Sequence, residues 1–145
     1  MQVKLKFGID KLLFGMKQAD VKKIYGEADK QFKDEDKNII LVYNQLQLRL
    51  TFYDDEDLRL GYIISSNAEL TLYDKFMINK TVEEIKKQLE FHNIKTWEKE
   101  DFDLAENHFN EENWLILQSE FGRIVKVEIG AIIKNEDDFD WKFNA

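Results

Sequence analysis

An eight-residue segment in the first half of the chain alternates strictly between apolar and polar or aromatic-polar side chains. Its first set is Leu46, Leu48, Leu50 and Phe52, and its second set is Gln47, Arg49, Thr51 and Tyr53. Successive side chains of a strand point to opposite faces of the sheet. The segment therefore predicts an antiparallel sheet with one buried face and one face open to water.

Two more strands are expected beside this one, at residues 38–43 and 58–64, because both are apolar runs bounded by polar turns. A helix is expected over Gln18–Tyr25, since its apolar residues recur at helical spacing and Gly26 ends it. Shorter strands are expected at residues 2–7 and 69–73, and residues 27–37 and 95–100 are expected to be polar and irregular.

The second half repeats this order of elements. Thr81 and Glu84 form a capping box, in which the threonine hydroxyl and the glutamate carboxylate accept from free backbone N–H groups, so a second helix begins there. Three strands are then expected at 103–109, 113–119 and 123–129. We therefore predict a single α+β domain over residues 1–145, with two similar helix-then-β-meander units at about 9–66 and 76–130.

In this predicted fold the two units form one antiparallel sheet, and the helices pack on one of its faces. Residues 135–145 form an acidic tail with aromatic residues at alternate positions. The tail is expected either to add an edge strand or to remain a free arm.

Charge and composition narrow the classes of partner. Twenty-one Lys and Arg stand against 29 Asp and Glu, a net charge of −8, which disfavours nucleic acid and anionic membranes. The same field would attract a basic partner, although an acidic surface also serves solubility alone.

The chain has no cysteine, which excludes disulfides and thiolate metal sites, and its first residues alternate apolar and basic side chains, unlike an export signal. We expect a cytoplasmic protein.

No motif for catalysis or metal binding is present in the sequence. Ser65, Ser66 and Ser119 are the only serines, none within a Gly-x-Ser-x-Gly turn. His92 and His108 lie too far apart in sequence for a paired metal motif. We predict no enzyme activity, no cofactor and no metal, leaving open an enzyme that uses carboxylates alone.

Residues 9–29, with Gly15-Met16, Val21 on the expected helix and Gly26 after it, resemble the opening of the small outer-membrane assembly lipoprotein family. In tandem, such a half-domain resembles the fold of β-lactamase inhibitory protein, and similar tandem units occur among bacterial immunity and inhibitor proteins. The resemblance implies a curved sheet with helices behind it and a role in inhibition.

From these features we predict an intracellular inhibitor or immunity-type protein that neutralises a basic partner protein, such as a toxin domain. The expected partner-binding residues are large side chains for contact, Arg49, Tyr53, Trp97 and Trp114, and acidic residues for electrostatic steering, Asp54, Asp55 and Asp57. Each aromatic residue could instead pack in the core. The alternative function is a module that carries a small molecule or peptide between sheet and helices, and the oligomeric state stays open.

Overall fold

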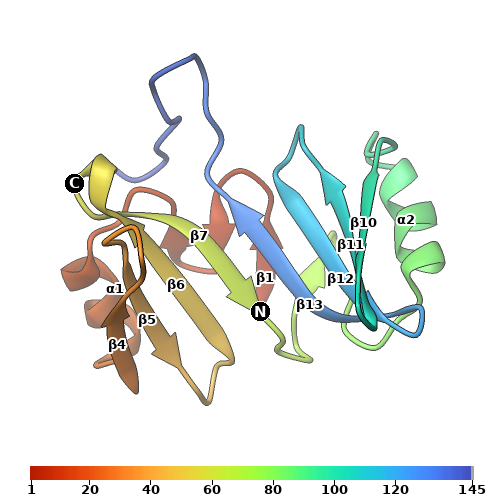
Figure 1. The fold of residues 1–145 in the computed structure, drawn as a ribbon, viewed down its shortest axis with the longest axis horizontal. Helices are drawn as coiled ribbons and strands as arrows, with labels where there is room; N and C mark the ends of the chain where they lie inside the picture. The colour runs from red at the N-terminus through yellow and green to blue at the C-terminus, as the bar shows by residue number, and fades with distance from the viewer. Residues whose placement is uncertain (145) are drawn as a thin grey trace.

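The computed structural model describes residues 1–144 and is built mainly from β-strands (Figure 1). Its two α-helices are α1, Gln18–Tyr25, and α2, Val82–Glu90. A short 3-10 helix, η1, spans Asp54–Glu56. The strands form two separate sheets, which we call the large sheet and the small sheet.

The large sheet has eight strands in the order β10-β11-β12-β13-β7-β6-β5-β4, and every neighbouring pair is antiparallel. Its strands in chain order are β4 Lys30–Lys33, β5 Ile39–Tyr43, β6 Leu48–Tyr53, β7 Arg59–Ser65, β10 Glu98–Phe102, β11 Ala105–Asn110, β12 Leu115–Glu120 and β13 Arg123–Gly130. The pairing of β7 with β13 joins the strands of the first half of the chain to those of the second half.

The small sheet has five strands in the order β3-β2-β1-β8-β9. They are β1 Gln2–Lys4, β2 Gly8–Ile9, β3 Leu12–Leu13, β8 Thr71–Leu72 and β9 Lys75–Phe76. Here β1 and β8 run parallel, with Gln2 opposite Thr71, so the start of the chain is hydrogen-bonded to its middle.

The predicted α+β class, with one sheet made of two helix-then-meander units, is therefore wrong. The chain is mostly β, with 42% strand and 14% helix, and its strands divide between two sheets. The strands expected at residues 2–7 and 69–73 contain β1 and β8, but β2, β3 and β9 have two residues each and are too short to show an alternating pattern in the sequence.

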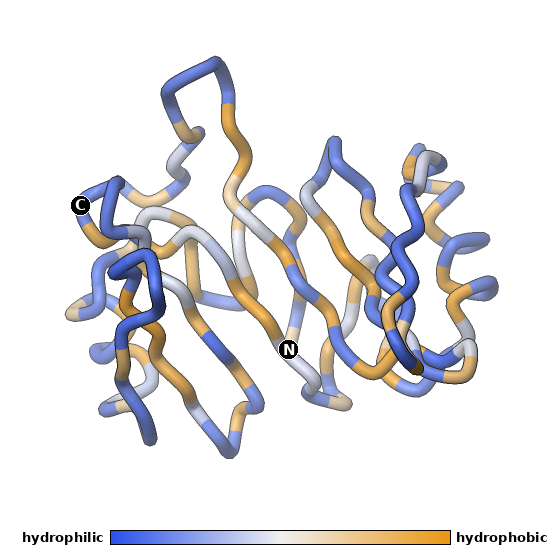
Figure 2. Tube along the Cα trace, viewed as in Figure 1, coloured by the Kyte–Doolittle hydropathy of each residue, from blue (hydrophilic) through white to orange (hydrophobic). Residues whose placement is uncertain are grey.

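Two strands of the large sheet lie where irregular structure was expected. They are the edge strands β4 and β10, and all of their residues are exposed. Figure 2 shows β10 as an almost continuously hydrophilic trace. A charged edge strand discourages pairing with other chains, and each of these two strands has a single apolar residue, Phe32 or Phe102, too few to indicate a strand in the sequence.

Other local expectations are confirmed. In β6, Leu48, Leu50 and Phe52 are buried while Arg49 is exposed. Helix α1 has the expected bounds. At the start of α2 the Thr81 hydroxyl accepts from the Glu84 N–H at 3.2 Å, and Glu84 accepts from the Thr81 N–H at 2.9 Å.

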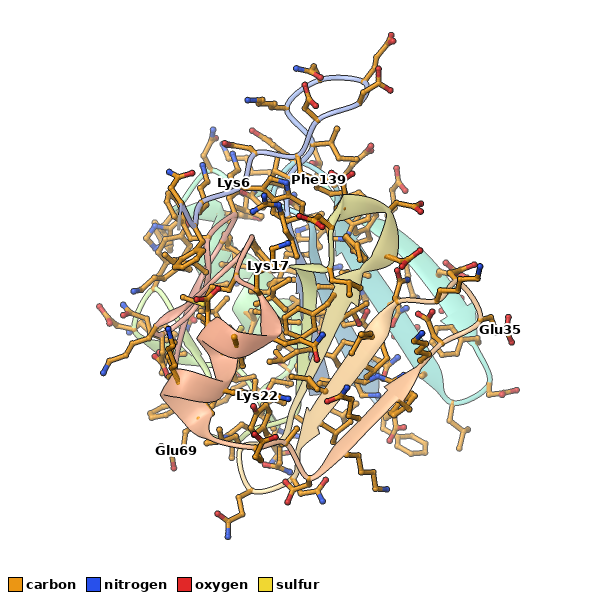
Figure 3. All side chains as sticks on the ribbon, turned by 90° about the vertical axis from the view of Figure 1, so that its left-hand side faces the viewer. Lys6, Lys17, Lys22, Glu35, Glu69 and Phe139 are labelled. Carbon is orange, nitrogen blue, oxygen red and sulfur yellow. The ribbon has the colours of Figure 1, made fainter. Side chains whose placement is uncertain are left out.

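The hydrophobic core lies on one side of the large sheet. It joins the inner face of that sheet to the small sheet and to one stripe of each helix, through residues such as Val21, Leu50, Leu72 and Ile85. Figure 3 looks along the molecule from one end and shows α1 on one side of the large sheet. The opposite face of the large sheet is thus left toward solvent.

The acidic and aromatic tail is neither an edge strand nor a free arm over the residues described. Its only ladder contact there is a single bridge between Ile133 and Phe139. The backbone N–H groups of Lys142 and Phe143 both donate to the Phe14 carbonyl at 3.0 Å, and Trp141 packs against the core. The tail therefore closes one end of the core without extending a sheet.

Candidate functional site

The outer face of the large sheet, which we call the open face, carries polar and apolar side chains in alternating rows. Residues paired across neighbouring strands share this face: Arg49, Thr51, Tyr62, Ile64, Glu128, Lys126, Ile116, Gln118, Phe109, Asn107, Glu98 and Glu100. None of these side chains belongs to the buried core. A broad sheet face of this kind, with aromatic and charged groups, is a surface on which another molecule can lie.

A groove crosses the open face over β10, β11 and β12. Trp114, Phe109 and Ile116 form its apolar part, and Glu98 and Glu100 lie along β10 beside them, around a volume of about 400 Å³. The Phe109 and Trp114 rings meet edge to face with their centroids 5.0 Å apart. We call this feature the tryptophan groove.

The turn between β11 and β12 places the indole in this groove. The Asn110 side chain accepts from the backbone N–H of Asn113. The backbone N–H of Trp114 donates to the Glu111 carbonyl at 3.1 Å. Trp114 itself has φ 46°, in the left-handed region that a bulky residue rarely adopts. Its ring lies directly over Gly130, where any Cβ would overlap it. Because Gly130 in β13 has no side chain, the indole ring can lie flat on the sheet at this position.

The two ends of the open face differ in charge. Glu98 and Glu100 form no ion pair within residues 1–144, while their neighbour Lys99 is held by Glu106 at 2.7 Å. Toward the other end, Arg49 lies over the Phe32 ring at 5.5 Å and borders a shallow hollow with Lys126. The acidic end is therefore the one with an aromatic floor and unneutralised carboxylates.

Tyr62 lies in the middle of the open face, and Tyr53 lies at its edge. The Tyr62 hydroxyl donates to Glu128 Oε1 at 2.5 Å, and burial followed by this contact raises the pKa of Tyr62. Burial alone raises the pKa of Tyr53 to about 12, because its ring lies over Gly61 and under Phe139. Both phenols stay neutral at ordinary pH, so neither serves as a general base.

The structure brings only some of the predicted partner-binding residues together. Arg49 and Trp114 lie on the open face, and Tyr53 lies at its edge, partly covered by Phe139. Trp97 lies on the opposite face, where the Lys86 ammonium sits 5.3 Å from its ring centre, so it does not join Trp114.

The three predicted steering residues occupy one end of β6. Asp54 and Asp55 belong to η1, beside a hollow that Tyr53 and Phe139 also line; Figure 3 shows Phe139 at this end. Asp57 follows η1 and pairs with Lys17 at 2.8 Å, which lowers the pKa of its carboxyl. Asp57 is thus partly neutralised.

Sequence reasoning missed Glu98, Glu100, Phe109 and Ile116 as site residues. The alternation of Glu98 and Glu100 is a strand pattern, but the four residues from Glu98 to Asp101 are all charged, so the segment was expected to be irregular. Phe109 and Ile116 were placed in strands, yet nothing in the sequence tells which face carries them.

A second polar cluster lies on the inner side, between α2 and the large sheet. The Lys86 ammonium donates to His108 Nδ1 at 2.9 Å, which leaves the proton of the neutral ring on Nε2, 3.3 Å from the Ser119 hydroxyl. Burial, and then Lys86, lower the pKa of His108. Because Nε2 then carries a proton and Ser119 is fully buried, this pair does not form a nucleophile and base.

Among residues 1–144, no three His, Asp or Glu side chains gather as metal ligands. In the same range, neither helix has the length and apolar character needed to cross a bilayer.

No protein-family model matches this chain, and no curated protein matches it. The fold is similar to a solved structure described as an extracellular protein containing a SCP domain from Bacillus anthracis str. Ames, with a TM-score of 0.51 and 14% sequence identity. The likeness covers 87% of this chain and 49% of that one, so this chain spans about half the length of the solved structure. At this identity the likeness concerns the fold alone.

These findings correct one part of the sequence interpretation. The chain is β-rich with two sheets, which does not fit an α+β immunity protein with an internal repeat. The resemblances to the assembly lipoproteins and to β-lactamase inhibitory protein stay predictions. The fold does bring the residues of the tryptophan groove together on one surface, the open face.

Proposed function

We propose that this chain is an inhibitor-type binding protein that docks a basic protein partner on the open face of the large sheet. The observation that carries the proposal is the tryptophan groove, in which Glu98 and Glu100, without an ion pair among residues 1–144, lie beside the rings of Trp114 and Phe109. A Lys or Arg side chain of the partner would enter this groove, with its cation against the carboxylates and its aliphatic stem on the rings.

The physical chemistry of the groove favours a cation over other ligands. Aromatic faces attract cations, and carboxylates without internal partners gain by pairing with one. The net charge of −8 adds a longer-range attraction that would speed the approach of a basic molecule and would weaken in salt. Trp and Arg side chains are also those that carry most interface energy, and Trp114 and Arg49 are both on this face.

The test is a titration of the ¹⁵N-labelled protein with a lysine- and arginine-rich peptide and with the same peptide in which each basic residue is glutamate. We expect the basic peptide to shift the Trp114 indole signal and the amides of β10 to β12, and the acidic peptide to shift neither. The double variant Glu98→Gln/Glu100→Gln should weaken basic-peptide binding about fivefold at low salt.

A matched control separates the groove from general attraction to an acidic protein. Glu111 and Glu112 are exposed in the turn next to the groove, so Glu111→Gln/Glu112→Gln removes the same two charges without altering its walls. This control should bind nearly as tightly as the parent chain. Equal weakening by both double variants would mean that only net charge attracts the peptide, and the proposed groove would be refuted.

A further inference from the structure

The open face carries a row of side chains that runs across the strands from one residue to its direct register partner on the next strand. It crosses β10, β11, β12, β13, β7 and β6, which lie side by side in that order (Figure 1). The row, which we call the cross-strand row, consists of Glu98, Phe109, Ile116, Glu128, Ile64 and Arg49. Neighbouring strands lie about 4.8 Å apart, so the row spans roughly 24 Å from Glu98 to Arg49.

The middle of the cross-strand row is mainly apolar and reachable from solvent. Phe109, Ile116 and Ile64 are partly exposed, and none of them packs in the hydrophobic core. Glu128 is charged, but one of its oxygens already accepts from the Tyr62 hydroxyl at 2.5 Å. Apolar side chains on a sheet face are removed from water when another molecule covers them. The row therefore extends the apolar contact surface beyond the tryptophan groove.

The two ends of the cross-strand row have opposite charges. Glu98 lies at the β10 end and Arg49 at the β6 end, and neither forms an ion pair within residues 1–144. A second row beside the first has the same order of charge, from acidic to basic: Glu100, Asn107, Gln118 and Lys126. A partner that pairs with both ends must therefore carry a cation over β10 and a carboxylate toward β6.

The direction of the row favours one backbone conformation for the partner. The row crosses the middle of a sheet face, where no strand edge is free, so an extended segment would leave its backbone N–H and C=O groups unpaired over apolar side chains. A helix pairs these groups internally. Its pitch of about 5.4 Å is also close to the spacing of the strands, so successive turns can meet successive strands.

We propose, building on the function proposed above, that the basic partner docks through an amphipathic helix of about 16 residues that lies along the cross-strand row. Its Lys or Arg side chain enters the tryptophan groove beside Glu98. Its apolar stripe covers Phe109, Ile116 and Ile64, and an Asp or Glu at its other end pairs with Arg49.

Three labelled peptides of about 18 residues with the same apolar stripe test this mode of docking. The bipolar peptide has Glu in its first turn and Lys in its last turn. The basic peptide has Lys in both turns, and the proline peptide is the bipolar peptide with one central proline. Fluorescence anisotropy at about 0.15 M salt measures the affinity of each peptide for the full-length chain.

The parent chain should bind the bipolar peptide about fivefold more tightly than the basic peptide. Attraction to the net charge of −8 alone would give the opposite order. The proline peptide should bind at least about tenfold more weakly than the bipolar peptide, because proline breaks the helix.

Variants of the chain locate the two contacts. Arg49 is exposed, and Arg49→Glu should reverse the order of the bipolar and basic peptides. Lys23→Glu makes the same change of charge at an exposed position on α1 and should keep the parent order. Ile64→Thr keeps a β-branched residue in β7 and should weaken binding of the bipolar peptide about threefold, because the apolar contact is smaller.

Three results would each overturn the helix: a basic peptide that binds the parent chain at least as tightly as the bipolar one, an unchanged order in Arg49→Glu, and a proline peptide that binds undiminished. If Glu98→Gln/Glu100→Gln still weakens peptide binding in these cases, the groove docks a basic partner of another shape and the proposed function stands. Binding that is indifferent to both Arg49→Glu and Glu98→Gln/Glu100→Gln would refute the two proposals together.

Discussion

Two glycines of the large sheet have aromatic rings where their side chains would be. Gly61 in β7 lies under the Tyr53 ring and Gly130 in β13 lies under the Trp114 ring, so a Cβ at either position would overlap the ring above it. Each glycine lets a ring lie flat against the backbone of the sheet. The positions of Tyr53 and Trp114 on the open face thus depend on residues that have no side chain at all.

Gly61→Ala should lower the free energy of unfolding by about 1–3 kcal/mol, because the added methyl group must displace the Tyr53 ring. Urea denaturation of the parent and the variant measures this loss. In a Tyr53→Ala background the ring is gone, so the same Gly61→Ala change should cost clearly less. An equal cost in both backgrounds would show that the overlap with Tyr53 is not the cause.

At the scale of elements, α2 is attached to the large sheet through both apolar and polar contacts. Ile85 and Leu89 enter the core, and Lys86 reaches His108 in β11. The groups that face His108 are Lys86, Glu106, Lys99 and Asp101, and burial and Lys86 are the strongest influences, both of which lower the pKa of His108. The neutral imidazole is the form that this contact accommodates.

The stability of the protein should therefore depend on pH through His108. Its pKa in the folded chain is below the ordinary 6.5, so the unfolded chain binds the proton more readily. The stabilising contribution is fully present above about pH 6.5 and is lost as the pH falls toward the folded-state value. Urea unfolding between pH 7.5 and 5.5 should show this fall in the parent chain and a flatter profile in His108→Gln.

His92→Gln provides the comparison, since His92 lies exposed beside Tyr73, away from the contact between Lys86 and His108. That variant should retain the pH dependence of the parent. A parent-like profile in His108→Gln would assign the pH dependence to other groups.

Across the whole molecule, the two ends of the chain close the core. Strand β1 pairs with β8 through the parallel ladder at Gln2 and Thr71. The tail brings Phe139, Trp141 and Phe143 against the core, with the Phe139 and Trp141 rings stacked at 4.8 Å. Apolar burial by segments distant in sequence is what joins the two sheets into one body.

A chain that ends at Lys134 should lose about 3 kcal/mol of stability, because three partly buried aromatic side chains no longer cover the core. Chemical denaturation measures the loss, and Trp141→Ala should show part of it. The exposed bend of the tail offers a matched control: Glu136→Gln/Asp137→Asn should leave stability within about 0.5 kcal/mol of the parent. Unchanged stability after truncation would mean that the tail is not part of the folded core.

The sequence by itself determined the local features whose cause lies within a few residues. The alternation in β6, the length of α1 and the capping box of α2 all depend on neighbouring side chains and backbone groups, so they could be predicted. The net negative charge and the absence of cysteine likewise follow from the sequence without knowledge of the fold.

Only the tertiary structure decided how the strands divide between two sheets and which side chains meet. The small sheet consists of strands too short to have a periodicity, and the parallel pairing of β1 with β8 joins segments about 70 residues apart. Arg49 and Trp114 share the open face while Trp97 lies behind it, because strand register, and not residue type, assigns each side chain to a face. The tryptophan groove lies on three consecutive strands, β10, β11 and β12, and only their register decides that Glu98, Phe109 and Ile116 share it.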